Sequence, residues 1–285
     1  MRDHRLEFPV VAMCRVLGVS RSGFYAWIDR GAGKPSDADR WMVAKIKEIH
    51  AQSRKTYGSP RVTKALRENE KITCNHKRVE RLMRIHEIRA VHRRRYRATT
   101  DSKHGRPVAA NILNRNFEIE AVDRVWLADV TCIRTYQGWL YLAAVQDLYS
   151  RRIVGWALES HMREELVLQA LEMALHDRRP GVGLLHHSDR GSQYAADGYQ
   201  ATLNRFGITC SMSRKGDCWD NAVMESFFHT LKVECVYQNR YHTFAEARRD
   251  IFWYIEGFYN TTRMHSALGY MSPVAYEAEH VRQVA

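Results

Sequence analysis

Three acidic residues stand in short stretches whose neighbours suit chemistry at one shared point. Asp129 sits at the polar end of an apolar, β-branched run, and Asp189 ends a second apolar run and is followed by a Gly/Ser turn. Glu225 lies in a stretch whose apolar residues recur at helical spacing. Because α/β sheets place chemistry at strand ends, two strand-end acids and one helix acid can converge. Three hard oxygen ligands without a nearby Cys/His set favour Mg²⁺ or Mn²⁺ over zinc.

Each of these acids also has an ordinary explanation. Taken alone, each one is better explained as a cap, a turn residue or a surface charge than as a metal ligand. All three contexts occur in one chain, and this joint occurrence favours a metal site.

The second half of the chain predicts the elements that would hold the acids. Period-2 runs and short turns predict strands, and apolar residues at helical spacing predict helices. The expected strands are 126–135, 139–147, 152–158, 183–188 and 208–213, and the expected helices are 163–177, 195–206, a helix capped by Asp220 that carries Glu225, and 243–259. A three-stranded meander followed by alternating helices and strands predicts an α/β fold with a mixed five-stranded sheet and flanking helices.

The first third of the chain predicts small all-α units. Residues 10–17 and 21–30 form a helix-turn-helix pattern around Gly18, and the second helix of such a pair can enter a major groove. Many helical hairpins that bind nothing share this pattern. Further helices are expected at 39–52, at 61–69 and from the N-cap Asn75 to about Ile88. We therefore divide the chain into a helix-turn-helix (1–33), a second helical DNA-binding unit with a basic tail (38–97), a linker (98–120) and a catalytic core with C-terminal helices (121–285).

Charge separates the same two parts of the chain. Residues 1–106 contain 26 Lys/Arg against 11 Asp/Glu, a net charge of +15, whereas residues 107–285 contain 18 against 21, a net charge of −3. This asymmetry predicts that the first part holds a polyanion and the second part does chemistry. Arg93, Arg94, Arg95 and Arg97 surround an aromatic residue in the basic tail, which favours phosphate contact over a merely solvated face.

Composition excludes several other classes. No run approaches the roughly 20 apolar residues of a membrane span, and the first residues lack a secretory hydrophobic region. The six cysteines form no C-x-x-C pair, which indicates free thiols in a reducing cytosol.

Residues 126–276 resemble the integrase-type (DDE) catalytic core of bacterial insertion-sequence transposases of the OrfB class, which are related to retroviral integrases. The resemblance rests on several motifs in the right order, and on the 35 residues that separate Asp189 from Glu225. The motifs are W-L-A-D-V-T (126–131), G-W-L-Y-L-A-A-V-Q-D (138–147), H-S-D-R-G-S-Q-Y (187–194), D-N-A-V-M-E-S-F-F (220–228) and Y-N-T-T-R-M-H-S-A-L-G-Y (259–270). The N-terminal region resembles the paired helix-turn-helix segments of the same class.

The resemblance implies a ribonuclease-H-like fold and a DNA transposase. It implies that Asp129, Asp189 and Glu225 bind Mg²⁺ or Mn²⁺, two ions in all, for nicking at the element's ends and strand transfer of the freed 3′-hydroxyl. The substrate would be double-stranded DNA, both terminal repeat and target. The protein would act as a homo-oligomer on DNA, alone or fused to an upstream helix-turn-helix protein, in the bacterial cytoplasm on the nucleoid and not at a membrane.

Three neighbours of the acids are candidate DNA contacts. Lys232 follows Glu225 by two helical turns and lies on nearly the same face of the helix. The resemblance supports a phosphate contact there. Asn221, one turn before Glu225, would contact DNA or orient the carboxylate. Arg190 would contact phosphate or pair with an acid.

Two other functions remain open from the sequence. A nuclease of the same fold would hydrolyse DNA without joining it, and a strand-transfer assay with a pre-cut end separates that function from transposition. A DNA-binding regulator that lost activity would retain the fold, and Mg²⁺-dependent nicking excludes it.

Overall fold

The structure of the chain is a computed structural model that describes residues 1–29, 36–91, 107–214 and 218–284. The basic cluster, predicted to bind phosphate, lies outside these described residues; it consists of Arg93, Arg94, Arg95 and Arg97. Among the described helices, none is long and apolar enough to cross a membrane.

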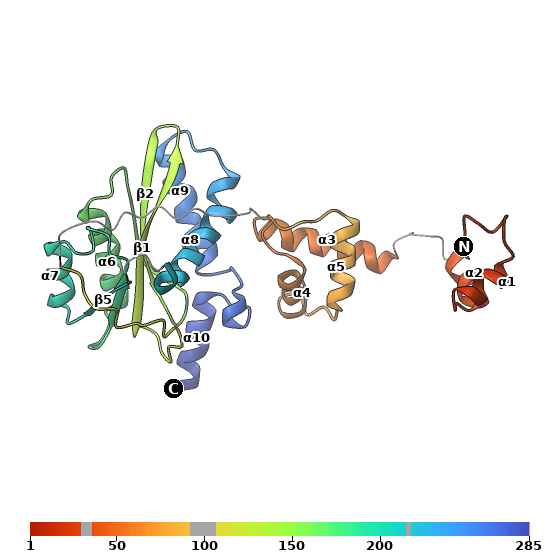
Figure 1. Cartoon of the computed structure of the whole chain (residues 1–285), viewed down its shortest axis with the longest axis horizontal. Helices are drawn as coiled ribbons and strands as arrows, with labels where there is room; N and C mark the ends of the chain where they lie inside the picture. Colours follow the sequence, from red (N-terminus) through yellow and green to blue (C-terminus); the bar gives the residue numbers. More distant parts are fainter. Residues whose placement is uncertain (30–35, 92–106, 215–217, 285) are drawn as a thin grey trace.

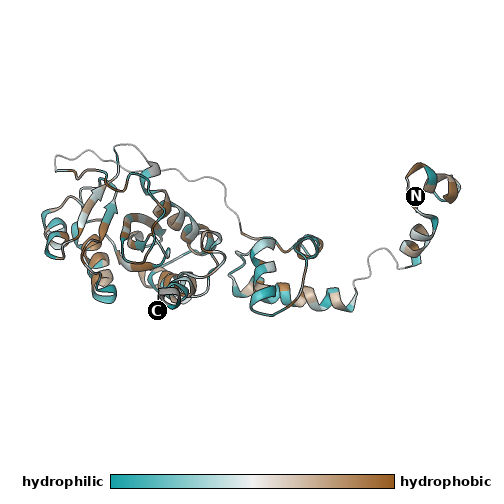
Figure 2. Cartoon of the chain, turned by 90° about the horizontal axis from the view of Figure 1, so that it is seen from below, coloured by the Kyte–Doolittle hydropathy of each residue, from teal (hydrophilic) through white to brown (hydrophobic). Residues whose placement is uncertain are grey.

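The first two helices confirm the predicted layout, in which a glycine turn joins two helices. They are α1 (Val10–Val16) and α2 (Arg21–Asp29), joined through Gly18 at a left-handed φ of 62°. Within the pair, the buried side chains are Cys14 and Phe24. Figure 2 colours part of this pair brown, because hydrophobic residues are frequent on it, and several of them are exposed. This pair therefore has little core of its own.

The next three helices form a unit with a core. They are α3 (Asp37–Gln52), α4 (Ser59–Glu68) and α5 (His76–Ile85). The Asn75 side chain accepts a hydrogen bond from Lys77 N at 2.9 Å, which confirms the predicted N-cap. Helix α4 begins two residues earlier than expected because Pro60 is compatible with a first helical turn. The buried core residues of this unit include Ile46, Val62, Leu66, Val79 and Leu82.

The second half of the chain contains the predicted mixed five-stranded sheet. Its strands are β1 (Val125–Thr135), β2 (Gly138–Asp147), β3 (Ile153–Glu159), β4 (Leu185–Ser188) and β5 (Thr209–Met212), in the order β3-β2-β1-β4-β5. The meander β1-β2-β3 is antiparallel, and β4 and β5 add to it in parallel. The last two strands are shorter than predicted. The sheet thus has the strand order and direction that the alternating second half requires.

Alternate residues of β1 enter different cores on the two faces of the sheet. Trp126 and Ala128 pack with α6 (Glu164–Arg178) and α7 (Asp197–Arg205). Leu127 and Ile133 pack on the opposite face with α8 (Ala222–Glu234) and α9 (Phe244–Phe252). Figure 1 shows these helices on the two sides of the strands. Period-2 alternation therefore covers both faces of β1.

The predicted long aromatic helix is confirmed, with one irregularity. Thr243 begins α9 with a capping box to Glu246, and the helix continues through a π-helical turn, Trp253–Tyr259. The remaining short elements are the 3₁₀ turns Cys218–Asn221, Val236–Gln238 and Ser266–Leu268 and the final helix α10 (Pro273–Val284).

One predicted cap was wrong. The N-cap of α8 is Asn221, not Asp220. The Asp220 carboxylate is committed elsewhere, because it accepts hydrogen bonds from Asn111 Nδ2 (2.7 Å), Arg115 Nε (3.0 Å) and Arg214 N (2.8 Å). This fully buried carboxylate is thus held by the segment before β1 and by the residues after β5.

The described part of the predicted linker, 107–120, has no helix or strand but packs against the sheet. Ile112 N donates to Ser211 Oγ at 2.9 Å, and Leu113 is buried. This part of the segment is held on the catalytic core.

Candidate active site

Asp129 and Asp189 lie side by side because of the register between β1 and β4. Ala128 pairs with Ser188 in this parallel ladder, and each acid is the residue that follows. Neighbouring strands lie about 4.8 Å apart. The expected strand-end position is wrong for Asp129, which lies inside β1, but the two acids are adjacent because the β1–β4 ladder ends at Ala128 and Ser188.

Backbone amides orient one oxygen of each acid. Val130 N donates to Asp129 Oδ1 at 2.7 Å, and Gly191 N donates to Asp189 Oδ1 at 2.8 Å. The second bond closes a tight turn directly after β4. Each side chain thus has a fixed direction before any ligand is bound.

Like charge and burial act together on Asp129. Burial is the main cause that raises the pKa of the Asp129 carboxyl well above its usual range, and the neighbouring Asp189 charge raises it further. Glu225 contributes a smaller repulsion in the same direction. The pKa of Glu225 is itself raised by burial. All three acids therefore belong to one electrostatic site that favours a bound cation.

Glu225 reaches this site on α8, which is tied to β1 at its first turn. Asn221 Nδ2 donates to the carbonyl oxygen of Ala128 at 3.2 Å, one residue before Asp129. Asn221 is buried, and its Oδ1 has no hydrogen-bond partner within the described part of the chain. The amide thus positions the catalytic helix, and its contact with DNA stays a prediction.

The three acids do not form a closed ligand set. Among the described residues, no three His, Cys, Asp or Glu side chains lie close enough together to hold one metal ion. Asp129 and Asp189 form the adjacent pair, and Glu225 faces them from another element.

Lys232 lies further along α8 and is buried. Burial lowers the pKa of its ammonium group, whereas Cys132 and Asp129 raise it. The ammonium group therefore belongs to the electrostatic site of Asp129, which the spacing from Glu225 indicated. Its phosphate contact stays a prediction.

Arg190 contacts the backbone near the acids. Its Nε donates to the carbonyl oxygen of Ser213 at 2.6 Å, which joins the turn after β4 to the end of β5. Its expected phosphate contact also stays a prediction.

Two histidines before Asp189 were missed as positioning residues. His187 contacts Ser211 Oγ at 2.8 Å through Nδ1 and Ser213 Oγ at 3.2 Å through Nε2. His186 Nε2 contacts Tyr199 OH at 2.9 Å. Burial lowers the pKa of His187 to about 4 and that of His186 to about 3, so both rings are neutral at pH 7. The H-S-D motif was the available signal, but it does not name partners more than ten residues away.

Comparisons with known protein families match residues 36–96 and 120–273. The integrase core domain matches residues 120–218, and a second integrase core domain family matches residues 206–273. The HTH-like domain matches residues 36–96, which is the unit of α3, α4 and α5.

Two relatives are similar over almost their full length. The uncharacterized 31 kDa protein of insertion element IS600 from Shigella sonnei is 44% identical over 273 residues, which cover 96% of this chain and 100% of that protein. The transposase InsF for insertion sequence IS3A from Escherichia coli (strain K12) is 39% identical over 283 residues, or 99% of this chain and 98% of that protein.

Among solved structures, a chain of the simian T-cell lymphotropic virus intasome superposes with a TM-score of 0.47 at 13% identity. The superposition covers 81% of this chain and 74% of that one.

Proposed function

The chain belongs to the insertion-sequence transposases of the IS3 family, and from this premise we propose that it nicks the ends of its element and transfers the freed 3′-hydroxyl to target DNA. The observation that carries this proposal is the register of β1 and β4, which makes Asp129 and Asp189 neighbours in an integrase core. Glu225 is the third acid of the site, on the helix tied to β1.

Divalent metal ions fit the donor set of this site. The donors are hard carboxylate oxygens, and burial and the neighbouring Asp189 charge raise the pKa of Asp129, so a bound cation would relieve this repulsion. We propose that Asp129 and Asp189 hold Mg²⁺ or Mn²⁺ jointly and that Glu225 completes the ligand set. Two bound ions would supply Lewis acidity for in-line displacement at phosphorus.

The chain's own residues would orient the substrate. Lys232 is a compact point charge beside Asp129, suited to hold a phosphate without directional demands. The bonds of His187 to β5 hold the end of β4, so Asp189 keeps its place when DNA binds. Water would be the nucleophile for nicking and the DNA 3′-hydroxyl the nucleophile for strand transfer. Neither step needs a covalent bond to the protein.

Two DNA substrates test the proposal. A labelled duplex with the inverted repeat that flanks the coding sequence should be nicked at the repeat end in Mg²⁺. A duplex with a pre-cut 3′ end should be joined to a target plasmid. Nicking without joining would establish a nuclease, and binding without either reaction would establish a regulator.

A measurement without DNA tests the metal site separately. Mn²⁺ should raise the melting temperature of the wild-type protein, because a ligand that binds only the folded state stabilises it. In Asp189→Asn this shift should be much smaller. Equal shifts in both proteins would contradict the assignment.

A further inference from the structure

The turn between α3 and α4 reaches out of its own unit and contacts the catalytic core. Arg54 Nη2 donates to Asp250 Oδ1 at 2.9 Å and lies 3.6 Å from Cys235 Sγ. The Arg54 guanidinium also lies over the Tyr254 ring, 5.7 Å from its centroid. One arginine from the helical unit therefore contacts α9, the residue after α8 and the π-helical turn.

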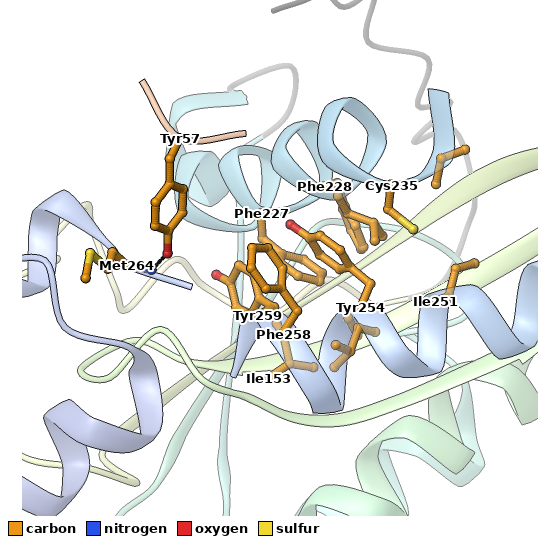
Figure 3. Packing of buried hydrophobic residues seen from close by; sticks show 14 of the residues in the cluster. Tyr57, Ile153, Phe227, Phe228, Cys235, Ile251, Tyr254, Phe258, Tyr259 and Met264 are labelled. Atoms are coloured by element: carbon orange, nitrogen blue, oxygen red, sulfur yellow. Dashed lines mark hydrogen bonds between the residues drawn. The ribbon is translucent and has the colours of Figure 1, made fainter. Parts of the chain in front are cut away.

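Tyr57 makes the second contact. Its hydroxyl accepts a hydrogen bond from Met264 N at 2.7 Å and donates one to the carbonyl oxygen of Thr262 at 3.3 Å. Figure 3 shows Tyr57 pointing toward Met264 beside the aromatic side chains Phe227 and Tyr259. Tyr57 is only 4% exposed, so this hydroxyl is satisfied entirely by the core.

Arg61 makes the third contact, and this one reaches the catalytic helix. Its Nη1 lies 3.8 Å from Glu234 Oε1. Glu234 is the last residue of α8, whose first turn carries Glu225. The Glu234 carboxylate also accepts from Arg263 Nε at 2.7 Å and from Tyr254 OH at 2.9 Å. The helical unit is thus joined to a buried network at the far end of α8.

The backbone at this turn is held in an unusual conformation. Arg54 and Lys55 have φ angles of 55° and 61°, which are left-handed and rare for residues with a side chain. Lys55 N donates to the carbonyl oxygen of His50 at 2.8 Å. Such strain persists only where the surroundings over-determine it. The three contacts with the core supply that constraint.

The same turn fixes the place where the basic tail leaves the unit. Val91 N donates to the carbonyl oxygen of Lys55 at 3.0 Å. The arginines of the basic cluster begin two residues after Val91. Val91, the last described residue before the basic cluster, is therefore held beside the contact between the helical unit and the core.

We propose that Arg54, Tyr57 and Arg61 form a latch that holds the helical unit in one orientation on the catalytic core and so selects which phosphate of a bound terminal repeat is cut. This inference rests on the proposed function. Directional hydrogen bonds and ion pairs define an orientation more narrowly than apolar packing, because each polar group requires its partner. The latch thereby couples sequence recognition to the position of cutting.

Tyr57→Phe and Arg54→Ala, singly and together, test the latch. Tyr57→Phe keeps the buried ring and removes only its hydroxyl, and Arg54 lies in the turn between α3 and α4, so affinity for a labelled terminal-repeat duplex should stay within about twofold of wild type. Cutting at the repeat end should fall by roughly tenfold, as expected for the loss of one or two buried hydrogen bonds. The products should spread over neighbouring phosphates, while Mn²⁺-dependent nicking of a duplex without the repeat stays unchanged.

Matched controls are Tyr136→Phe, on an exposed ring, and Arg40→Ala, whose partner Asp37 lies within the helical unit. Both should cut at the wild-type position. Latch variants that also cut only there, or that lose affinity in parallel with cutting, would overturn the proposal. If Arg54→Ala does not fold, Tyr57→Phe decides.

Thermal unfolding tests the latch without catalysis. The wild-type helical unit and core should unfold together, and the double variant should unfold in two transitions. A wild-type protein that binds but does not cut would refute the proposed function alone. In that case two transitions would still support the latch, and a single transition would overturn it.

Discussion

Buried charge is arranged differently at the two ends of α8: acids lie together near the first turn, and an acid is paired with an arginine at the last. At the first turn, burial raises the pKa of Glu225 and of the nearby Asp129, and the charges of Asp189 and Glu225 raise that of Asp129 further. At the last turn, Glu234 is paired with Arg263 through two bonds of 2.7 and 2.8 Å. Near the first turn, the acids repel one another, which favours a bound cation. At the last turn, Arg263 neutralises Glu234, which stabilises the fold. Substitutions at the two ends should therefore have opposite signatures.

The largest expected effect is a loss of activity on substitution of the acids near the first turn of α8. Asp189→Asn should reduce nicking and strand transfer by about a thousandfold or more, since several kcal/mol of transition-state stabilisation are lost. DNA affinity should stay close to wild type because the positive charge lies in residues 1–106. Asp129→Asn and Glu225→Gln should behave alike. Near-normal activity in Mg²⁺ for any one of them would remove that residue from the site.

The same substitutions should not reduce stability. Because the pKa of Asp129 is raised in the folded protein, its charged form opposes folding at pH 7. Asp129→Asn removes that repulsion, so its melting temperature without metal should equal or exceed that of wild type. A clear decrease would show that the two ends of α8 are not opposites.

At the paired end the expected effect is on stability. Glu234→Ala leaves Arg263 buried without its carboxylate partner, which costs about 3–5 kcal/mol. Urea unfolding should show this loss with an unchanged slope. Glu246→Ala, at the exposed cap of α9, is a milder comparison of about 1 kcal/mol. Equal losses in both variants would contradict the assignment of a buried network.

Lys232 lies in the last turn of α8, but its charge acts on Asp129, and its substitution tests whether the acidic site also holds DNA. Lys232→Ala should reduce turnover on terminal-repeat DNA by about 10- to 100-fold, as for one charge-assisted bond. Metal affinity should stay the same or rise slightly because a nearby cation has gone, and calorimetric Mn²⁺ titration measures it. Marked loss of metal binding would instead make Lys232 a support for the carboxylates.

The basic cluster provides a contrast with both ends, because its charges would act on DNA alone. Neutralising Arg93, Arg94, Arg95 and Arg97 together should weaken binding to any sequence. Each lost phosphate contact should reduce the log–log salt slope by about 0.9. An unchanged slope would show that these side chains face solvent.

The smallest expected effect is the pH dependence of stability near the paired end. Burial, followed by the charges of Arg263, Arg61 and Arg151, lowers the pKa of His265 to about 2. Below pH 6.5 the unfolded chain takes up a proton at this residue that the folded chain does not. Stability is therefore complete above pH 6.5 and should fall by up to about 1 kcal/mol per pH unit below it.

Thermal melts between pH 7 and pH 5 measure this effect. His265→Gln should reduce the decline without removing it, because His186 and His187 also have lowered pKa values, and His176→Gln, on an exposed face, should leave it unchanged. A wild-type slope in His265→Gln would assign the pH dependence to other groups.

The sequence predicted the acids and the sheet because these features have local signatures. Asp129 and Asp189 adjoin apolar runs that predict strands, and Glu225 lies in a stretch whose apolar residues recur at helical spacing. The predicted order of elements then requires a mixed sheet, which the structure confirms.

Contacts between distant residues could not be predicted in this way. Asp220 has the composition and position of a helix cap, yet its carboxylate binds Asn111 and Arg115 about a hundred residues earlier. Tyr57 similarly occupies a predicted turn, and nothing local indicates its bond to Met264. Local pattern identifies which residues are polar and near a turn, but tertiary packing selects their partners.

The length of α8 limits which insertions and deletions this helix can accept. Glu225 and Glu234 are nine residues apart, which places them about 13.5 Å apart along the axis and on roughly opposite sides of the helix. Inserting or deleting one residue between them would rotate one acid by about 100° relative to the other. No neighbouring loop can compensate, since β1 holds one end and Arg263 the other. Insertions and deletions between Glu225 and Glu234 should therefore be rejected, even at positions of α8 where substitutions are tolerated.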